Sequence, residues 1–197
     1  MRRVGPTPVT VGVLALQGDF REHLVAVEAV GARGMEVRLA ADLDVIDALV
    51  IPGGESTTIG RLATRYGMID PLRKHINAGL PVLGTCAGMI VLASKLTDGA
   101  QPQLEVLDVV VERNAFGRQN DSFESDLDVK GLDEPMHAVF IRAPLIARAG
   151  PEVEILAEHG GRPVVVRQGD ILASSFHPEL TDDRRLHEML IAMVEER

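Results

Sequence analysis

The sequence predicts an α/β fold: a mostly parallel central sheet with helices on both faces and a mixed or antiparallel extension. In the first half of the chain, short β-rich apolar runs alternate with segments whose apolar residues recur at helical spacing, the pattern of βαβ units. In the second half, strand candidates follow one another across short turns, which favours antiparallel or mixed pairing. A length of 197 residues suits a single domain with a substantial core.

The alternating elements begin with Val9–Leu16, which is β-rich and almost wholly apolar, as is typical of a strand buried on both faces. Gln17-Gly18-Asp19 ends this strand. Further strands are expected at Met35–Leu39, Ala48–Ile51 and Pro81–Leu83, and helices at Phe20–Val30, Ser56–Tyr66, Ile69–Ala78 and Met89–Ala93.

The second half is expected to supply the extension of the sheet. Its strand candidates are Val106–Val111, Ser125–Val129, Ala138–Arg142, Val153–Ala157, Pro163–Arg167 and Ile171–Phe176. A final helix is expected from Asp182, with an apolar stripe that includes Leu186, Leu190 and Met193. Such a stripe is typical of a helix that covers a core.

Composition excludes several classes of function. A hydrophobic content of 46% with 25% charged residues is ordinary for a soluble domain. The net charge of −9 argues against broad nucleic-acid binding. No apolar run approaches a membrane span, and the N-terminus shows no signal-peptide pattern. One unpaired cysteine fits a reducing compartment, so a cytoplasmic location is expected.

The most informative motif is Gly84-Thr85-Cys86-Ala87-Gly88, which lies between two apolar runs. A strand, a sharp turn and a helix would place Cys86 at the turn, in the cysteine version of a nucleophile elbow. Small flanking residues allow the tight packing that such a strained turn needs. Several classes of hydrolase are compatible with this motif alone.

A reactive cysteine needs a base and a group that orients the base. Among six histidines, His177 follows a β-rich run and precedes Pro178 and Glu179. Pro178 disfavours helix at His177, and in an extended segment residues two apart share a face, so His177 and Glu179 can point to one site. A surface histidine beside a solvated glutamate is equally compatible. A metal-binding H-x-E pair is the weaker interpretation, since no third ligand is suggested nearby.

Pro52-Gly53-Gly54-Glu55-Ser56 follows an expected strand. Two adjacent glycines let the backbone approach a ligand, either as an oxyanion hole or as a phosphate site at a helix start. A plain turn with Ser56 as helix N-cap is the common alternative.

Together these motifs resemble the class I, or triad-type, glutamine amidotransferases. Longer segments make the chain similar to the glutaminase subunits of the deoxyxylulose-independent pyridoxal phosphate synthases. These segments are Leu16-Gln17-Gly18, Pro52–Thr58, Val111–Gln119, Phe140–Pro144 and Ser175–Thr181. The likeness covers a single domain over residues 9–197, and residues 1–8 look like an N-terminal leader.

The resemblance implies a flavodoxin-like three-layer fold and hydrolysis of L-glutamine to glutamate and ammonia through a glutamyl thioester. It assigns Cys86 as nucleophile, His177 as acid and base, and Glu179 as its orienting partner. The oxyanion would be held by the N–H of Ala87 and one from Gly53 or Gly54. It implies that the residues that bind glutamine are Gly54, Glu55, Ser56, Arg113, Ile141 and Arg142. No cofactor and no metal ion are expected. Without the resemblance, Arg113 and Arg118 would each be read as a solvated charge.

The partner that the resemblance implies is a (β/α)8-barrel synthase subunit that receives the ammonia, twelve synthase subunits carrying up to twelve glutaminase subunits. The Gly53-Gly54 peptide is expected to reorient when this partner docks. Three other interpretations stay open: the glutaminase of a different amidotransferase, a γ-glutamyl cysteine hydrolase acting alone, and a non-enzymatic subunit.

Overall fold

The computed structural model describes residues 8–113 and 122–197. The expected leader, apart from Pro8, lies outside these residues. So does the second part of the Val111–Gln119 segment, including Arg118.

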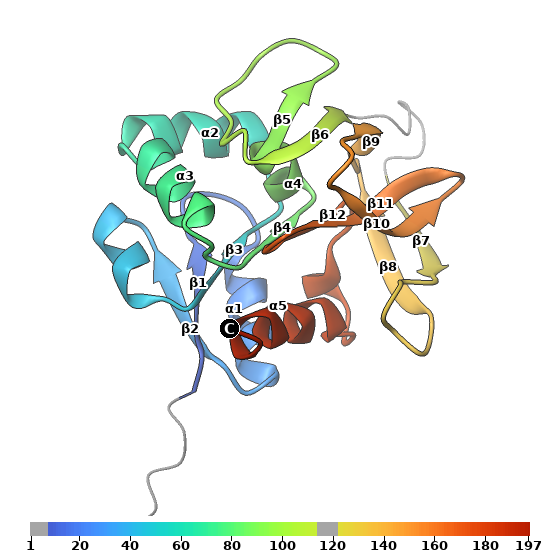
Figure 1. The fold of residues 1–197 in the computed structure, drawn as a ribbon, viewed down its shortest axis with the longest axis horizontal. Helices are drawn as coiled ribbons and strands as arrows, with labels where there is room; N and C mark the ends of the chain where they lie inside the picture. The colour runs from blue at the N-terminus through green and yellow to red at the C-terminus, as the bar shows by residue number, and fades with distance from the viewer. Residues whose placement is uncertain (1–7, 114–121) are drawn as a thin grey trace, which may run out of the picture.

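A seven-stranded sheet forms the centre of the molecule, in the order β10-β11-β12-β4-β3-β1-β2 (Figure 1). Five neighbouring strands are parallel: β2 (Arg33–Val37), β1 (Thr10–Leu14), β3 (Ala48–Ile51), β4 (Val82–Thr85) and β12 (Ile171–Ser174). The strands β11 (Arg162–Gln168) and β10 (Glu154–His159) continue the sheet antiparallel. The predicted parallel sheet with an antiparallel extension is therefore confirmed.

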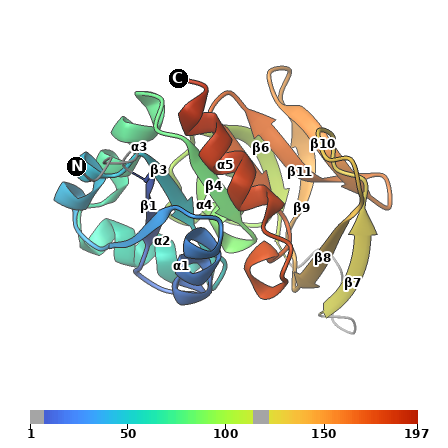
Figure 2. The same cartoon turned by 90° about the horizontal axis from the view of Figure 1, so that it is seen from below.

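Helices cover both faces of this sheet. The helices α1 (Phe20–Ala29) and α5 (Arg185–Glu195) lie together on one face, as Figure 2 shows. The opposite face carries α2 (Ser56–Arg65), α3 (Ile69–Asn77) and α4 (Ala87–Leu92), with the 3-10 helix η1 (Ala40–Val45) beside α3. Among the described residues, no helix combines the length and the apolar character that crossing a membrane requires.

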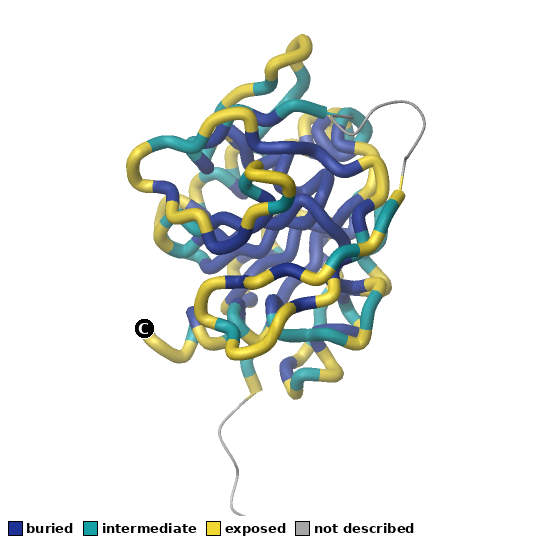
Figure 3. The backbone as a smooth tube through the Cα atoms, turned by 90° about the vertical axis from the view of Figure 1, so that its right-hand side faces the viewer, coloured by how far each residue is buried: buried dark blue, intermediate teal, exposed yellow. Residues whose placement is uncertain are grey.

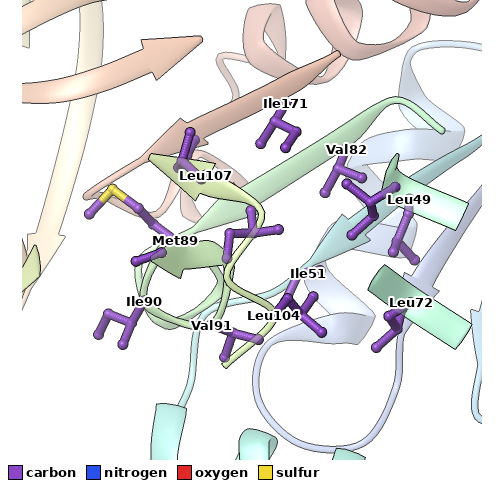
Figure 4. Packing of buried hydrophobic residues seen from close by; sticks show 14 of the residues in the cluster. Leu49, Ile51, Leu72, Val82, Met89, Ile90, Val91, Leu104, Leu107 and Ile171 are labelled. Carbon is purple, nitrogen blue, oxygen red and sulfur yellow. The ribbon is translucent and has the colours of Figure 1, made fainter. Parts of the chain in front are cut away.

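The central strands β3, β4 and β12 are buried along their whole length, because both of their faces are covered. Along β3, Leu49 and Ile51 join the core on the α2–α4 side, whereas Ala48 and Val50 join the core on the α1–α5 side, as the two-residue period of a strand requires. Figure 4 shows the core on the α2–α4 side, in which Met89 of α4 packs beside these strands. Buried backbone is concentrated in this central sheet (Figure 3).

Two smaller sheets flank the main one. The strands β5 (Ala93–Leu96), β6 (Leu107–Glu112) and β9 (Leu145–Ala149) form one, and β7 (Ser122–Leu127) and β8 (Met136–Ile141) form an antiparallel pair. The extension of the Met89 helix through Ala93 was wrong. Leu104 and Val106 donate their N–H groups to the carbonyls of Val91 and Leu92, so the helix stops and Ala93 begins a strand.

The start of the last helix also differs from the prediction. It begins at Arg185, three residues after Asp182. The carboxylate of Asp183 accepts the backbone N–H of Arg185 at 3.2 Å, which satisfies a donor in the first turn.

Candidate active site

The elbow at Cys86 is a strained turn between β4 and α4. Cys86 has φ 48° and ψ −105°, a backbone conformation that non-glycine residues adopt only where the surrounding structure enforces it. Its N–H donates to the carbonyl of Ser174 on the neighbouring strand β12 at 2.8 Å. The turn therefore holds the thiol at the carboxyl edge of the parallel strands, where open α/β sheets bind ligands.

The glycines on either side of Cys86 are required by packing. A Cβ on Gly84 would lie 2.4 Å from Cδ1 of Leu92, and one on Gly88 would lie 1.9 Å from the carbonyl oxygen of Ile51. The elbow is thus pressed against β3 and against its own helix. The small residues of the motif allow this approach, as the sequence predicts.

His177 and Glu179 follow β12 and form a buried pair. Nδ1 of His177 lies 2.7 Å from Oε1 of Glu179, and both residues are about 5% exposed. The expected extended geometry was wrong for Glu179, which lies in the 3-10 helix η2 (Pro178–Leu180). The tight turn after His177, rather than a shared strand face, brings the carboxylate back to the imidazole.

The electrostatics of the pair favour a charged imidazole. Burial opposes the charge, but interactions with Cys86 and Glu179 outweigh it and raise the pKa of His177 to about 10. A protonated histidine beside a cysteine stabilises the thiolate, which is the nucleophilic form of the side chain.

Cys86 and His177 open into one cavity of about 500 Å³. Its lining includes these residues expected from the sequence: Gly54, Glu55, Ser56, Cys86, Ala87, Arg113, Ile141, Arg142 and His177. Glu179 lies behind His177, away from the cavity. The volume suits an amino-acid-sized ligand.

The Gly53-Gly54 loop is anchored from two sides. The N–H of Gly53 donates to Oγ1 of Thr85 at 3.1 Å, and the carbonyl of Gly53 accepts the N–H of Asp19 at 3.0 Å. Gly54, with φ 148°, lines the cavity. In this arrangement the N–H of Gly53 is engaged within the protein, so Gly54 is the better placed of the two candidate oxyanion donors.

The cap of α2 is not the one in the alternative interpretation of this segment as a plain turn. Glu55, rather than Ser56, is the N-cap, and its carboxylate accepts the N–H groups of Thr57 and Thr58 at 3.0 and 2.7 Å. Ser56 donates its hydroxyl to Oε1 of Gln101 at 3.2 Å. Its side chain is therefore tied to the neighbouring loop and does not close the helix.

The two arginines of the cavity are held differently. Arg113 donates to the Asp98 carboxylate at 3.2 Å and to Oε1 of Gln101 at 2.9 Å, so a bound carboxylate would have to share or replace these partners. Arg142 is exposed and has φ 43°. The carbonyl of the preceding Ile141 lies 3.9 Å from the Cys86 sulfur.

Several residues of the site were missed by sequence reasoning. Asp19 places Oδ2 3.5 Å from Nδ1 of His177, so a third ligand-type group does lie beside the H-x-E pair. The sequence feature that could have identified Asp19 is its place in the short segment that follows the carboxyl end of β1. His23 lies behind Glu179. Its signal was a histidine on the apolar stripe of α1, four residues before the buried Val27.

His187 on α5 gives a prediction for stability against pH. Burial, and next the positive charge of Arg184, lower the pKa of His187 from 6.5 to about 4. Between these values the unfolded chain binds a proton that the folded chain does not, so stability falls as the pH drops from 6.5 to 4. One such group contributes a slope of about 1.4 kcal/mol per pH unit.

Urea unfolding at a series of pH values measures this slope. We expect His187→Leu to have a flatter profile by about one proton between pH 6.5 and 4. Leu190→Ala, on the same helix and fully buried, should lower stability while keeping the wild-type slope. Equal slopes for His187→Leu and wild type would contradict the prediction.

Comparison with known proteins places this geometry in a class. A solved glutamine amidotransferase shares 55% identity with a TM-score of 0.90, covering 94% of this chain and 98% of that chain. A structure of PurLQS from Thermotoga maritima, at 16% identity and a TM-score of 0.71, covers 96% of this chain and 98% of that chain and shares the fold alone. The fold is that of the class I glutamine amidotransferases.

The family follows from the sequence comparisons. The chain belongs to the SNO glutamine amidotransferase family, whose profile matches residues 13–196. The protein named pyridoxal 5'-phosphate synthase subunit PdxT of Streptomyces avermitilis is 56% identical over 191 residues, 95% of this chain and 94% of that protein. The protein of the same name from Acidothermus cellulolyticus is 57% identical over 192 residues, 93% of each chain.

Proposed function

We propose that this chain hydrolyses L-glutamine to L-glutamate and ammonia as the glutaminase subunit of a pyridoxal 5'-phosphate synthase. The observation that carries the proposal is one cavity that joins a cysteine on an elbow, a histidine paired with a buried carboxylate, and two arginines. Membership of a glutamine amidotransferase family and the printed names of relatives at 56–57% identity support the substrate and the pathway.

In the proposed mechanism, the Cys86 thiolate attacks the side-chain amide carbon of glutamine. The negative charge that develops on the amide oxygen is stabilised by the N–H of Ala87, which begins α4 and lacks an acceptor within the helix, and by that of Gly54. Protonated His177 gives its proton to the departing nitrogen, so ammonia leaves and a glutamyl thioester remains.

The second half-reaction reverses the role of His177. The neutral imidazole takes a proton from water, the resulting hydroxide attacks the thioester carbonyl, and glutamate leaves as the thiolate is restored. Glu179 holds Nδ1 of His177 throughout and stabilises its positive charge.

Substrate recognition is proposed for Gly54, Glu55, Ser56, Arg113, Ile141 and Arg142. The α-carboxylate of glutamine suits a guanidinium, which binds carboxylates through paired hydrogen bonds. Arg142 is exposed at the cavity, whereas Arg113 would have to exchange part of its contact with Asp98.

The partner proposed to receive the ammonia is a (β/α)8-barrel synthase subunit, in a complex of up to twelve subunits of each kind in the cytoplasm. Delivery to a partner fits the chemistry, because free ammonia is protonated at neutral pH and lost to solvent.

The test is glutamate release from glutamine by this chain with and without its synthase subunit. We expect turnover to rise at least about 10-fold when the synthase is added, consistent with an effect of about 1.4 kcal/mol or more. Equal turnover in both cases would contradict the proposed partnership. An absence of glutamate in both cases, with a folded protein and a synthase shown to bind, would contradict the glutaminase assignment.

A further inference from the structure

A chain of buried polar side chains continues behind Glu179. Nε2 of His23 lies 3.2 Å from Oε2 of Glu179 and 3.0 Å from Oγ1 of Thr85. Nδ1 of His23 lies 2.9 Å from Nε2 of His187. All four residues are buried, and His23 is 0% exposed. The proposed mechanism uses neither histidine.

The positions of the protons on these two histidines follow from their surroundings. Both histidines are neutral near pH 7, because burial and nearby positive groups lower the pKa of His23 well below its ordinary value and that of His187 to about 4. A neutral imidazole has one donor and one acceptor nitrogen. Two arrangements are therefore open: each ring carries its hydrogen on Nε2, or each carries it on Nδ1.

The second arrangement is costly at both ends. It would point a lone pair of His23 at the Glu179 carboxylate, and it would leave a buried N–H on Nδ1 of His187, an atom without a partner among the described residues. The first arrangement places only a lone pair on Nδ1 of His187. It also directs the Nε2–H of His23 to Oγ1 of Thr85, with Oε2 of Glu179 beside it at 3.2 Å. An unpaired buried donor and a repulsive contact are both avoided.

Thr85 and the start of α1 also hold the Gly53-Gly54 loop. Thr85, which accepts the N–H of Gly53 at 3.1 Å, is the hydroxyl neighbour of His23. Asp19, the residue before α1, donates its N–H to the carbonyl of Gly53 at 3.0 Å. The start of α1 thus contacts both the carboxylate behind the base and the loop that faces the substrate.

We propose that His23 is a positioning residue of the glutaminase reaction, which holds the second oxygen of Glu179 and connects it through Thr85 to the Gly53 loop. This role rests on the proposed function. Oε1 of Glu179 is engaged by His177. Oε2 accepts no hydrogen bond of good geometry from the described residues, and Nε2 of His23, 3.2 Å away, is the nitrogen that faces it. A donor facing Oε2 favours the ionised carboxylate against the burial that raises the pKa of Glu179. The ionised carboxylate in turn keeps His177 oriented and charged.

Two amide substitutions separate this role from a general one in packing. His23→Gln places an NH₂ donor near the position of the imidazole Nε2, whereas the shorter amide of His23→Asn reaches only as far as Nδ1. In the complex with the synthase, we expect His23→Asn to lower kcat about 10- to 100-fold with KM within about 3-fold of wild type, the effect of losing a donor that faces a charged group. His23→Gln should retain kcat within about 5-fold.

A second readout needs neither glutamine turnover nor the partner. Cys86 is the only cysteine in the sequence, so alkylation of the isolated chain by iodoacetamide reports on its thiolate alone. We expect alkylation near neutral pH to be about 10-fold slower in His23→Asn and near the wild-type rate in His23→Gln. If wild type releases no glutamate, the proposed function fails, and the alkylation rates still decide the role of His23.

Val27→Ala is the matched control, since Val27 is buried on the same helix but packs in the core. It should lower thermal stability without changing kcat or the alkylation rate. His23→Leu replaces His23→Asn if the latter does not fold. Three results would overturn the proposal. The first is wild-type kcat and alkylation in His23→Asn, or in His23→Leu if it replaces His23→Asn. The others are a His23→Gln variant as impaired as His23→Asn, and a Val27→Ala variant that reproduces the loss.

Discussion

Cys86→Ala should lower synthase-supported glutamine hydrolysis by about 10,000-fold or more, the scale of losing the nucleophile of a catalytic triad. No thioester can form without the sulfur, and the remaining oxyanion donors and arginines can only bind the substrate. Because alanine keeps the Cβ of cysteine, the elbow conformation at φ 48° meets no added strain. Glutamate release by the complex measures the effect.

The control is that binding and folding persist. Cys86→Ala should unfold at the wild-type temperature within a few degrees, and it should still bind glutamine in a calorimetric titration with the synthase present. Activity of the variant within about 10-fold of wild type would exclude Cys86 as the nucleophile and with it the proposed mechanism.

Gly88→Ala should strongly destabilise the folded chain. The added Cβ would lie 1.9 Å from the carbonyl oxygen of Ile51 and 2.8 Å from its carbon. These are backbone atoms in the centre of the sheet, which cannot move aside as a flexible side chain could. We expect the free energy of unfolding to fall by more than about 3 kcal/mol, or the chain not to fold. Urea denaturation of the purified variant measures this.

Gly131→Ala is the matched control for that substitution. A Cβ there meets no heavy atom within 4 Å, and only the positive φ of 91° opposes it, at a cost of about 1–2 kcal/mol. If Gly88→Ala proved no more destabilising than Gly131→Ala, the close packing of the elbow on β3 would be contradicted.

The sequence predicted those strands and helices whose bounds are set by neighbouring residues in the chain. The strand Ala48–Ile51 was predicted at its observed bounds, because Pro-Gly-Gly ends the apolar run and so fixes the end of the strand. The strand β9 was missed, since only its first two residues are buried and its partner β6 lies far away in the sequence. The strand β5 was not predicted, and its first residue, Ala93, was assigned to the preceding helix, because the end of that helix is set by contacts with residues 104–106.

The candidate site shows the same division. The residues of the elbow and of the His177–Glu179 pair could be chosen from their spacing, since each group lies within a few residues of the chain. The groups that support them could not. Asp19 and His23 meet the pair only because the segment that follows β1 lies beside the end of β12, and the spacing within the two motifs does not show which distant residues join them. The wrong geometry expected at Glu179 arose because Pro178 starts a 3-10 turn.

The pairing of β4 with β12 has a consequence for how this scaffold can change. Thr85 is in register with Ser174, so the nucleophile and the base extend from adjacent strands whose separation is fixed at about 4.8 Å by backbone hydrogen bonds. The rim of the cavity belongs instead to other parts of the chain, such as the end of β8 at Ile141 and the connecting segment that begins with Arg142. Insertions or exchanges in those segments can therefore alter what the cavity admits while the reactive pair keeps its spacing, which makes the rim the place to redesign the molecule for a different amide.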